Sequence, residues 1–172
     1  EMQRSLVGSE MCIRDRLKTA RPSQFKLYQS DTGMLMARYP VGVAQAAYLD
    51  SKEPNLGGIY ENVVAQQLAA QNRQLYYYQT KKRGEVDFVV DGPDGTAVPI
   101  EVKSGSYYHA HAALGHVLDT AEYGVRLGIV FSRGNVERNG AVLYLPLYAT
   151  WALSDVLGDS CAEGIKLEVK PV

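Results

Sequence analysis

The sequence predicts an α/β domain in which a central mixed sheet is flanked by helices. Three patterns predict it: an apolar helical stripe within residues 59–71, three short strands in close succession between residues 74 and 104, and an apolar strand at residues 126–132 that follows a second helical segment. Their order along the chain is α-β-β-β-α-β, with a further strand and a short helix behind it. Alternation of this kind favours a sheet layered between helices.

Length and composition bound the class of protein. The chain has 172 residues, a formal net charge of −1, 46% hydrophobic residues and 22% charged residues. These values suit one globular domain and give no compositional support for non-specific nucleic-acid binding, although a local basic patch remains compatible with them. No apolar run approaches the roughly 18 residues of a membrane span. We therefore expect no membrane partner. Cys12 and Cys161 form neither a disulfide framework nor a metal-ligand spacing, so we expect a reducing compartment and a cytoplasmic location.

The first residues are expected to be foreign to the fold. The chain starts at Glu1, and the stretch SLVGSEMCIRDR (residues 5–16) has neither helical nor strand periodicity. It resembles a translated sequencing-library adapter, which would make the chain a fragment and residues 1–16 a poorly packed, non-native segment. Behind it we expect a lead-in helical segment at residues 17–57, a core at 58–157 and a tail at 158–172.

The lead-in opens with an extended piece at residues 25–28. Ser30 or Asp31 can then N-cap a helix that carries residues 34–36, and residues 40–58 combine a short helical run with a Pro/Gly-rich connection. Residues 31–33 are also an Asp-Thr-Gly triplet of the aspartic-protease type. That chemistry needs two facing aspartates and the chain has one such triplet, so a helix cap is favoured.

The clearest helix covers residues 59–71. Its apolar stripe consists of Tyr60, Val63, Val64 and Leu68. With about 3.6 residues per turn, Glu61 falls at the edge of that stripe. We therefore expect its carboxylate to point towards the rim of the sheet.

The remaining elements follow from turns and apolar runs. The polar turn KKRG and the hairpin turn DGPDG separate the first three strands. The strand at 126–132 is apolar throughout, which is typical of burial on both faces. The predicted elements are strands at residues 74–80, 85–90, 97–104, 126–132 and 140–148, and helices at 107–124 and 149–157.

The stretch GEVDFVVDGPDGTAVPIEVKSG (residues 84–105) carries the candidate chemistry. Because side chains alternate along a strand, Glu101 and Lys103 share one face and Ile100 and Val102 the other. If the turn pairs the two strands as a hairpin, Asp87 can lie on the same side of the sheet as Glu101.

In the preceding strand the same alternation groups the acidic residues. Glu85 and Asp87 are expected on one face, opposite Val86, Phe88 and Val90.

Neighbouring carboxylates repel each other unless positive charge lies between them. Lys103 supplies one charge, and a divalent cation such as Mg²⁺, which prefers hard oxygen ligands, would supply two. Asp87 and Glu101 are therefore candidate metal ligands, Lys103 is a candidate for orienting or deprotonating the attacking water, and Glu61 could hold a metal-bound water or a second ion. A solvated strand face would show the same D-x(n)-E-x-K pattern, and both interpretations stay open on spacing alone.

Four sequence blocks in a fixed order carry a wider resemblance. They are KLYQSDTGMLMA, GGIYENVVAQQL, the YYY…GEVDFVV…PIEVKSG stretch and LPLY, spread over roughly residues 22–150. Together they resemble the C-terminal domain of a family of prokaryotic AAA+-type ATPases, domain of unknown function 4143. That domain is similar to the PD-(D/E)xK nuclease superfamily, which implies a restriction-endonuclease-like core.

The resemblance assigns a role to each candidate residue. Glu61 matches the acidic residue of the first core helix, Asp87 the metal-binding aspartate and Glu101 the second carboxylate. Lys103 matches the lysine two residues on, and Val102 between them is grouped with the metal ligands. Every functional position of the pattern is thus filled.

One position departs from the pattern, because Val86 stands where the superfamily has proline. The resemblance implies metal-dependent hydrolysis of phosphodiester bonds in DNA, with Mg²⁺ or Mn²⁺, in a domain attached to an upstream ATPase domain of the same polypeptide. No G-x-x-x-x-G-K-S/T loop occurs in the sequence itself. The alternative is a non-catalytic interaction or regulatory module that binds nucleic acid or a protein partner.

Basic residues and histidines are further candidates for contacts with a ligand. Lys81, Lys82 and Arg83 form a turn that could touch backbone phosphates, although a solvated turn has the same composition. The histidines at positions 109, 111 and 116 do not share one face of a helix, so surface or partly buried histidines are favoured over zinc ligands.

Overall fold

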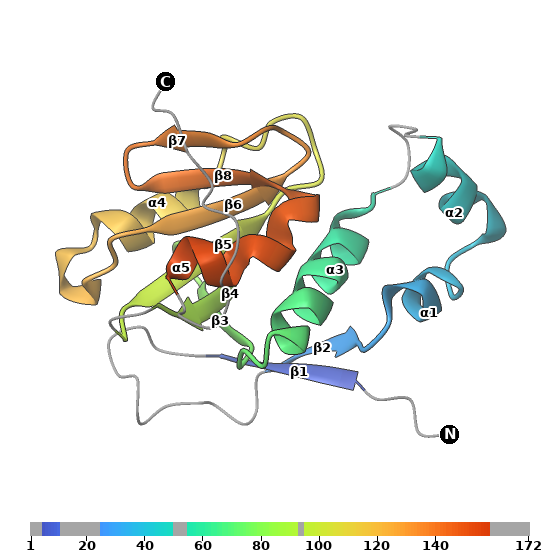
Figure 1. Ribbon diagram of the computed structural model, residues 1–172, viewed down its shortest axis with the longest axis horizontal. Coiled ribbons are helices and arrows are strands. Elements are labelled where there is room, and N and C mark those ends of the chain that lie inside the picture. Colours follow the sequence, from blue (N-terminus) through green and yellow to red (C-terminus); the bar gives the residue numbers. More distant parts are fainter. Residues whose placement is uncertain (1–4, 11–24, 50–54, 93–94, 159–172) are drawn as a thin grey trace.

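An eight-stranded mixed sheet runs through the computed structural model, which describes residues 5–10, 25–49, 55–92 and 95–158 (Figure 1). Its spatial order is β2-β1-β3-β4-β5-β6-β8-β7. β3, β4 and β5 form an antiparallel meander, whereas β5, β6 and β8 run parallel. The strands are β1 (Ser5–Glu10), β2 (Phe25–Gln29), β3 (Tyr76–Thr80), β4 (Gly84–Asp91), β5 (Ala97–Val102), β6 (Gly128–Ser132), β7 (Glu137–Asn139) and β8 (Val142–Pro146).

Helices cover both faces of this sheet, as the sequence predicts. α3 and α5 lie over one face of β4, β5, β6 and β8, and α4 lies over the opposite face (Figure 1). The apolar side chains of these helices pack with the strands on the two faces. The helices are α1 (Thr32–Met36), α2 (Val41–Tyr48), α3 (Gly57–Ala70), α4 (Ala112–Asp119) and α5 (Leu153–Leu157), with short 3-10 helices η1 (Ala121–Tyr123) and η2 (Leu147–Ala152).

The buried face of α3 differs from the predicted stripe. Val64 and Leu68 are fully buried as expected, but Tyr60 and Val63 are only half-buried. Asn62 is buried instead: its side chain accepts from the Gln29 backbone N–H at 2.7 Å and donates to the Gln29 carbonyl at 3.0 Å. A polar residue is stable there because these hydrogen bonds replace those to water, and they tie α3 to β2.

The central strand β6 confirms the prediction of burial on both faces. Ile129 and Phe131 belong to the core on the α3 side, and Val130 packs with Leu114 of α4 on the other. The predicted helix at 107–124 is shorter than expected, because α4 starts only at residue 112 and is followed by η1. Residues 107–111 lie outside the helix, and the rings of Tyr108 and His109 pack against Tyr144 of β8. The sequence did not predict this aromatic contact.

Two strands were not predicted. β7 is short, polar and largely exposed, so it lacks an apolar pattern. β1 lies within residues 5–16, where we expected a poorly packed segment, yet residues 5–10 pair antiparallel with β2 and parallel with β3. Strand addition uses backbone hydrogen bonds, which need no side-chain periodicity. The remainder of residues 1–24 and the tail beyond residue 158 lie outside the described residues.

The lead-in matches the prediction where the structure describes it. Residues 25–29 are extended, and Asp31 caps α1 by accepting from the Met34 backbone N–H at 2.8 Å. The Asp-Thr-Gly triplet is therefore a helix start. α2 and a connection to α3 follow.

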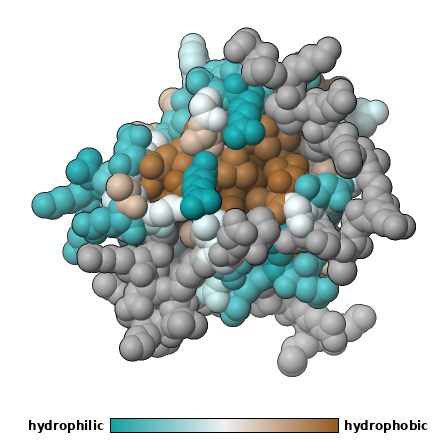
Figure 2. All heavy atoms as spheres, turned by 60° about the vertical axis from the view of Figure 1, so that its left-hand side comes forward, coloured by the Kyte–Doolittle hydropathy of each residue, from teal (hydrophilic) through white to brown (hydrophobic). Residues whose placement is uncertain are grey.

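On the face shown in Figure 2 an apolar area in the middle is framed by hydrophilic side chains. Among the described residues, no helix is both long enough and apolar enough to cross a lipid bilayer.

Candidate functional site

The site begins with the pairing of β4 and β5. The two strands are antiparallel, with Phe88 opposite Ile100, so the start of β4 lies beside the end of β5. There Oδ2 of Asp87 accepts a hydrogen bond of 2.7 Å from the backbone N–H of Val102. This bond joins the predicted aspartate to the residue between Glu101 and Lys103.

A β-bulge sets the direction of Asp87. Tyr76 pairs with Val89 and Tyr78 with Val86, so Asp87 and Phe88 together oppose a single residue of β3. The extra residue breaks the alternation. Val86 packs on the α4 side, whereas Phe88 packs on the α3 side. The expectation that Val86, Phe88 and Val90 share a face is therefore wrong, because the bulge turns the second part of β4 over.

The alternation of β5 is confirmed. Ile100 and Val102 belong to the core beneath α3, and Glu101 and Lys103 are paired with each other, with Nζ of Lys103 2.6 Å from Oε1 of Glu101. Glu101 is 6% exposed, and none of the described residues donates a hydrogen bond to its buried Oε2. One oxygen of this buried carboxylate is thus left for a ligand or a water molecule.

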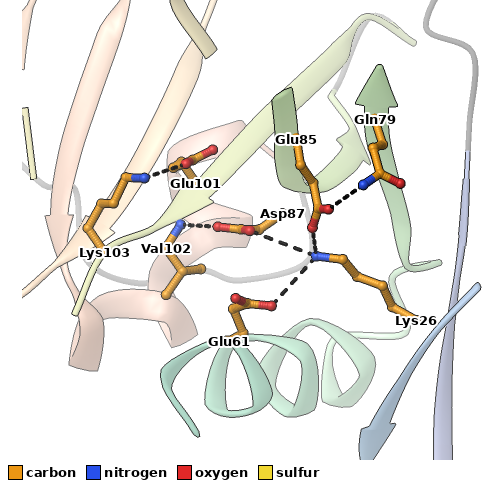
Figure 3. A network of polar contacts seen from close by, with 8 residues as sticks. All are labelled: Lys26, Glu61, Gln79, Glu85, Asp87, Glu101, Val102 and Lys103. Carbon is orange, nitrogen blue, oxygen red and sulfur yellow. Dashed lines mark hydrogen bonds and ion pairs between the residues drawn. The ribbon is translucent and has the colours of Figure 1, made fainter. Parts of the chain in front are cut away.

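We expected Asp87 and Glu101 on the same side of the sheet, but the structure points their side chains in different directions. The Glu101 side chain points away from α3. The Asp87 side chain instead lies near Lys26 of β2, which also contacts Glu61 of α3 (Figure 3). The two carboxylates flank the backbone at Val102. They remain close enough for their charges to interact.

The third carboxylate, Glu61 of α3, reaches the rim of the sheet as predicted, and Lys26 of β2 meets it there. The Lys26 ammonium lies 3.6 Å from Glu61 and 3.8 Å from Asp87, and it is in direct contact with Glu85 (Figure 3). Gln79 donates to the other oxygen of Glu85 at 3.0 Å. A single ammonium thus faces three carboxylates.

Electrostatics at the site reflect the excess of negative charge. Burial, together with repulsion from Glu101 and Glu61, raises the pKa of Asp87 from 3.8 to about 7, against the opposing effects of the Val102 N–H and Lys26. Burial also raises the pKa of Glu101, and the hydrogen bond from Lys103 opposes that rise. For Lys26, burial favours the neutral amine, but the surrounding acidic groups outweigh it and raise its pKa. Additional positive charge would relieve the repulsion.

Solvent reaches the site through a pocket of about 510 Å³ between β2, α1 and α3. Lys26, Glu61 and Asn62 are among its lining residues, together with Tyr28 and Tyr39. A small cation or a phosphate group can therefore approach Lys26 and Glu61 from this side.

The residues fit a hard divalent cation by their chemistry. As the side chains stand, no three His, Cys, Asp or Glu residues within the described ranges converge to hold a metal ion. The oxygens present are nevertheless of the kind Mg²⁺ and Mn²⁺ prefer, and Oε2 of Glu101 is buried without a partner from the described residues. Asp87, Glu101 and Val102 are the residues that would hold such an ion.

The basic turn lies at the same end of the sheet. Lys81, Lys82 and Arg83 are exposed and connect β3 to the start of β4. Because β4 is antiparallel to β5, the start of β4 adjoins the end of β5 that carries Glu101.

Two residues at the site were missed or given little weight. Lys26 lies far from the hairpin in sequence, and only the path of β2 brings it to Glu61 and Asp87. His111 donates to or accepts from the Tyr144 hydroxyl at 2.7 Å and acts electrostatically on Glu101. A partly buried histidine, as favoured from the sequence, is what the structure shows.

Fold and site together define an α/β domain with a lysine-bridged carboxylate cluster at the end of its central strands. The chain belongs to the family described as Domain of unknown function (DUF4143), whose model matches residues 56–149, more than half of the sequence. The match covers α3, the β3–β5 meander, α4, β6 and β8. No curated protein and no solved structure matches the chain.

Proposed function

We propose that the protein is a metal-dependent nuclease of PD-(D/E)xK type with a restriction-endonuclease-like core, and that it hydrolyses phosphodiester bonds in DNA. The observation that carries the proposal is the pairing at the end of β5. Asp87 is bonded to Val102, and Val102 stands between the buried carboxylate of Glu101 and Lys103. These residue types can hold a divalent metal ion and orient a water molecule for phosphodiester cleavage.

Each residue has a distinct part in the proposed reaction. Asp87, Glu101 and Val102 would hold Mg²⁺ or Mn²⁺, which supplies positive charge to polarise the phosphate. Lys103 is 30% exposed at its side chain, so its ammonium can reach a water molecule outside the sheet, orient it for attack and stabilise the negative charge that develops as the water loses its proton. Glu61, 30% exposed on the far side of Asp87, can position a second water molecule.

Substrate binding would use local rather than overall charge. The net charge of −1 gives no general attraction to DNA. Lys81, Lys82 and Arg83 are exposed at the catalytic end of the sheet, where they can contact backbone phosphates. We further propose a cytoplasmic protein in which an ATPase domain precedes this domain in the same polypeptide.

Cleavage of labelled DNA in the presence of Mg²⁺ or Mn²⁺ tests the proposal. Asp87→Asn keeps the side-chain shape and Lys103→Met removes one charge, and each should lower the single-turnover rate at least about 100-fold. Asp119→Asn, on an exposed residue at the end of α4, is the matched control and should leave the rate unchanged. Cleavage that persists in both site variants removes these residues from the mechanism.

The second candidate is the non-catalytic module. One observation favours it: Lys26 already supplies positive charge to Glu61, Glu85 and Asp87, as expected of a structural ion-pair network. A folded protein that binds DNA or a partner without cleaving in either metal would favour this module over the nuclease.

A further inference from the structure

Lys26 occupies an unusual place for a lysine of a peripheral strand. Its side chain is only 21% exposed, and its ammonium contacts carboxylates from β4 and α3. The same ammonium lies 5.5 Å from the centre of the Tyr77 ring, whose face also favours a cation. The fold therefore holds one positive charge inside the candidate site.

This charge is shared with residues that have a proposed role in the reaction. Glu61 and Asp87 are 3.6 and 3.8 Å from the ammonium, which is the reach of an ion pair without a close hydrogen bond. Two cations that use the same carboxylate oxygens repel each other strongly in a partly buried site. An ion held by Asp87 must therefore displace Lys26 or bind against its charge.

Glu85 provides a place for the displaced ammonium. It makes the closest of the three contacts with Lys26 through Oε1, while Oε2 accepts from Gln79. The hydrogen bond from Gln79 thus holds the Glu85 carboxylate in place, and Glu85 is not one of the proposed metal ligands.

We propose that Lys26 is a resident counter-cation that competes with the divalent metal for Glu61 and Asp87, and that Glu85 retains the ammonium when metal binds. The inference rests on the proposed metal site. It adds a residue that sets metal affinity, and it gives Lys26 the part of neutralising some of the negative charge of the metal-free site.

Metal affinity of the folded chain tests the competition. Mn²⁺ and Mg²⁺ are titrated by calorimetry into the wild type, Lys26→Gln and Arg138→Gln. Both variants lose one positive charge, but Arg138 lies on the exposed strand β7 and bonds the Gly140 carbonyl. Lys26→Gln should bind metal at least about tenfold more tightly than the wild type, and Arg138→Gln should match the wild type.

A second variant separates competition from structural damage. In Glu85→Gln the ammonium loses its closest partner and turns to Glu61 and Asp87, so metal should bind at least about threefold more weakly. Opposite effects of Lys26→Gln and Glu85→Gln are expected from competition, whereas loss of structure would weaken binding in both. Circular dichroism confirms that each variant is folded.

The outcomes distinguish the two proposals. Equal or weaker metal binding by Lys26→Gln, in a wild type that does bind metal, overturns the role of Lys26 and leaves the nuclease proposal standing. No metal binding by any of the folded proteins overturns the proposed metal site, and the competition with it.

Discussion

Replacing Asp87 with asparagine should stabilise the protein at alkaline pH, although it removes a central residue of the site. Asparagine has the same shape, and its carbonyl oxygen can still accept from the Val102 N–H. What it removes is a negative charge that burial and two neighbouring carboxylates oppose.

The magnitude follows from the pKa of Asp87. The difference between 3.8 and about 7 corresponds to roughly 4 kcal/mol at about 1.4 kcal/mol per pKa unit. Because the folded-state pKa is raised, the folded protein binds more protons than the unfolded chain between these two values. The contribution of Asp87 to stability is therefore fully present below about pH 4 and is lost as the pH rises through about 7. Asp87→Asn should be more stable than the wild type by about 2–4 kcal/mol at alkaline pH, and equal to it near the acid end.

Urea unfolding followed by circular dichroism, at a series of pH values without metal, measures this difference. A gain of that size corresponds to a rise in Tm of roughly 5–15 °C. Asp119→Asn serves as the control and should change the free energy of unfolding by no more than about 0.5 kcal/mol at any pH. The reasoning is refuted if Asp87→Asn is no more stable than the wild type at alkaline pH, or if its advantage persists unchanged into acid.

Three further predictions concern the scaffold and the basic turn. Asn62→Ala removes the hydrogen bonds that tie α3 to β2 and should lower the free energy of unfolding by about 2–3 kcal/mol in urea, and a loss below about 1 kcal/mol would contradict the role given to that residue. Phe88→Ala leaves a cavity beneath α3 and should cost about 3–5 kcal/mol in the same assay, whereas a surface-like cost below about 1 kcal/mol would argue against the bulge that places Phe88 in this core. Alanine at Lys81, Lys82 and Arg83 should weaken DNA binding for all sequences alike and reduce the slope of log affinity against log salt by up to about 3, measured by fluorescence anisotropy, and an unchanged slope would exclude the turn from the interface.

Much of the core could be predicted because local patterns coincide with the tertiary environment. The apolar run of β6 is buried on both faces, the alternation of β5 separates Ile100 from Glu101, and Asp31 starts a helix. In each case the short-range signal and the final packing agree.

The exceptions arise where a partner distant in sequence decides the geometry. The bulge in β4 depends on its register with β3, so alternation alone wrongly grouped Val86 with Phe88 and Val90. In the sequence, Asn62 is a polar residue that interrupts an apolar helix. Its burial is explained only by its hydrogen bonds to the backbone of β2.

The candidate site also contains residues that the sequence identifies and one that it does not. Glu61, Asp87, Glu101 and Lys103 were identified from the sequence, and the structure gathers them at one end of the sheet. Lys26 carries no local signal, because its role exists only once β2 lies beside the rim of α3.

Localising bound Mn²⁺ by NMR tests the central claim most directly. Substoichiometric Mn²⁺ broadens amide signals near the ion, and the spectrum of the ¹⁵N-labelled protein would show which residues those are. We predict that broadening centres on the amides of Val102 and Lys103 and disappears in Asp87→Asn. Broadening that centres elsewhere, or that is unchanged in this variant, would contradict a metal site built on Asp87.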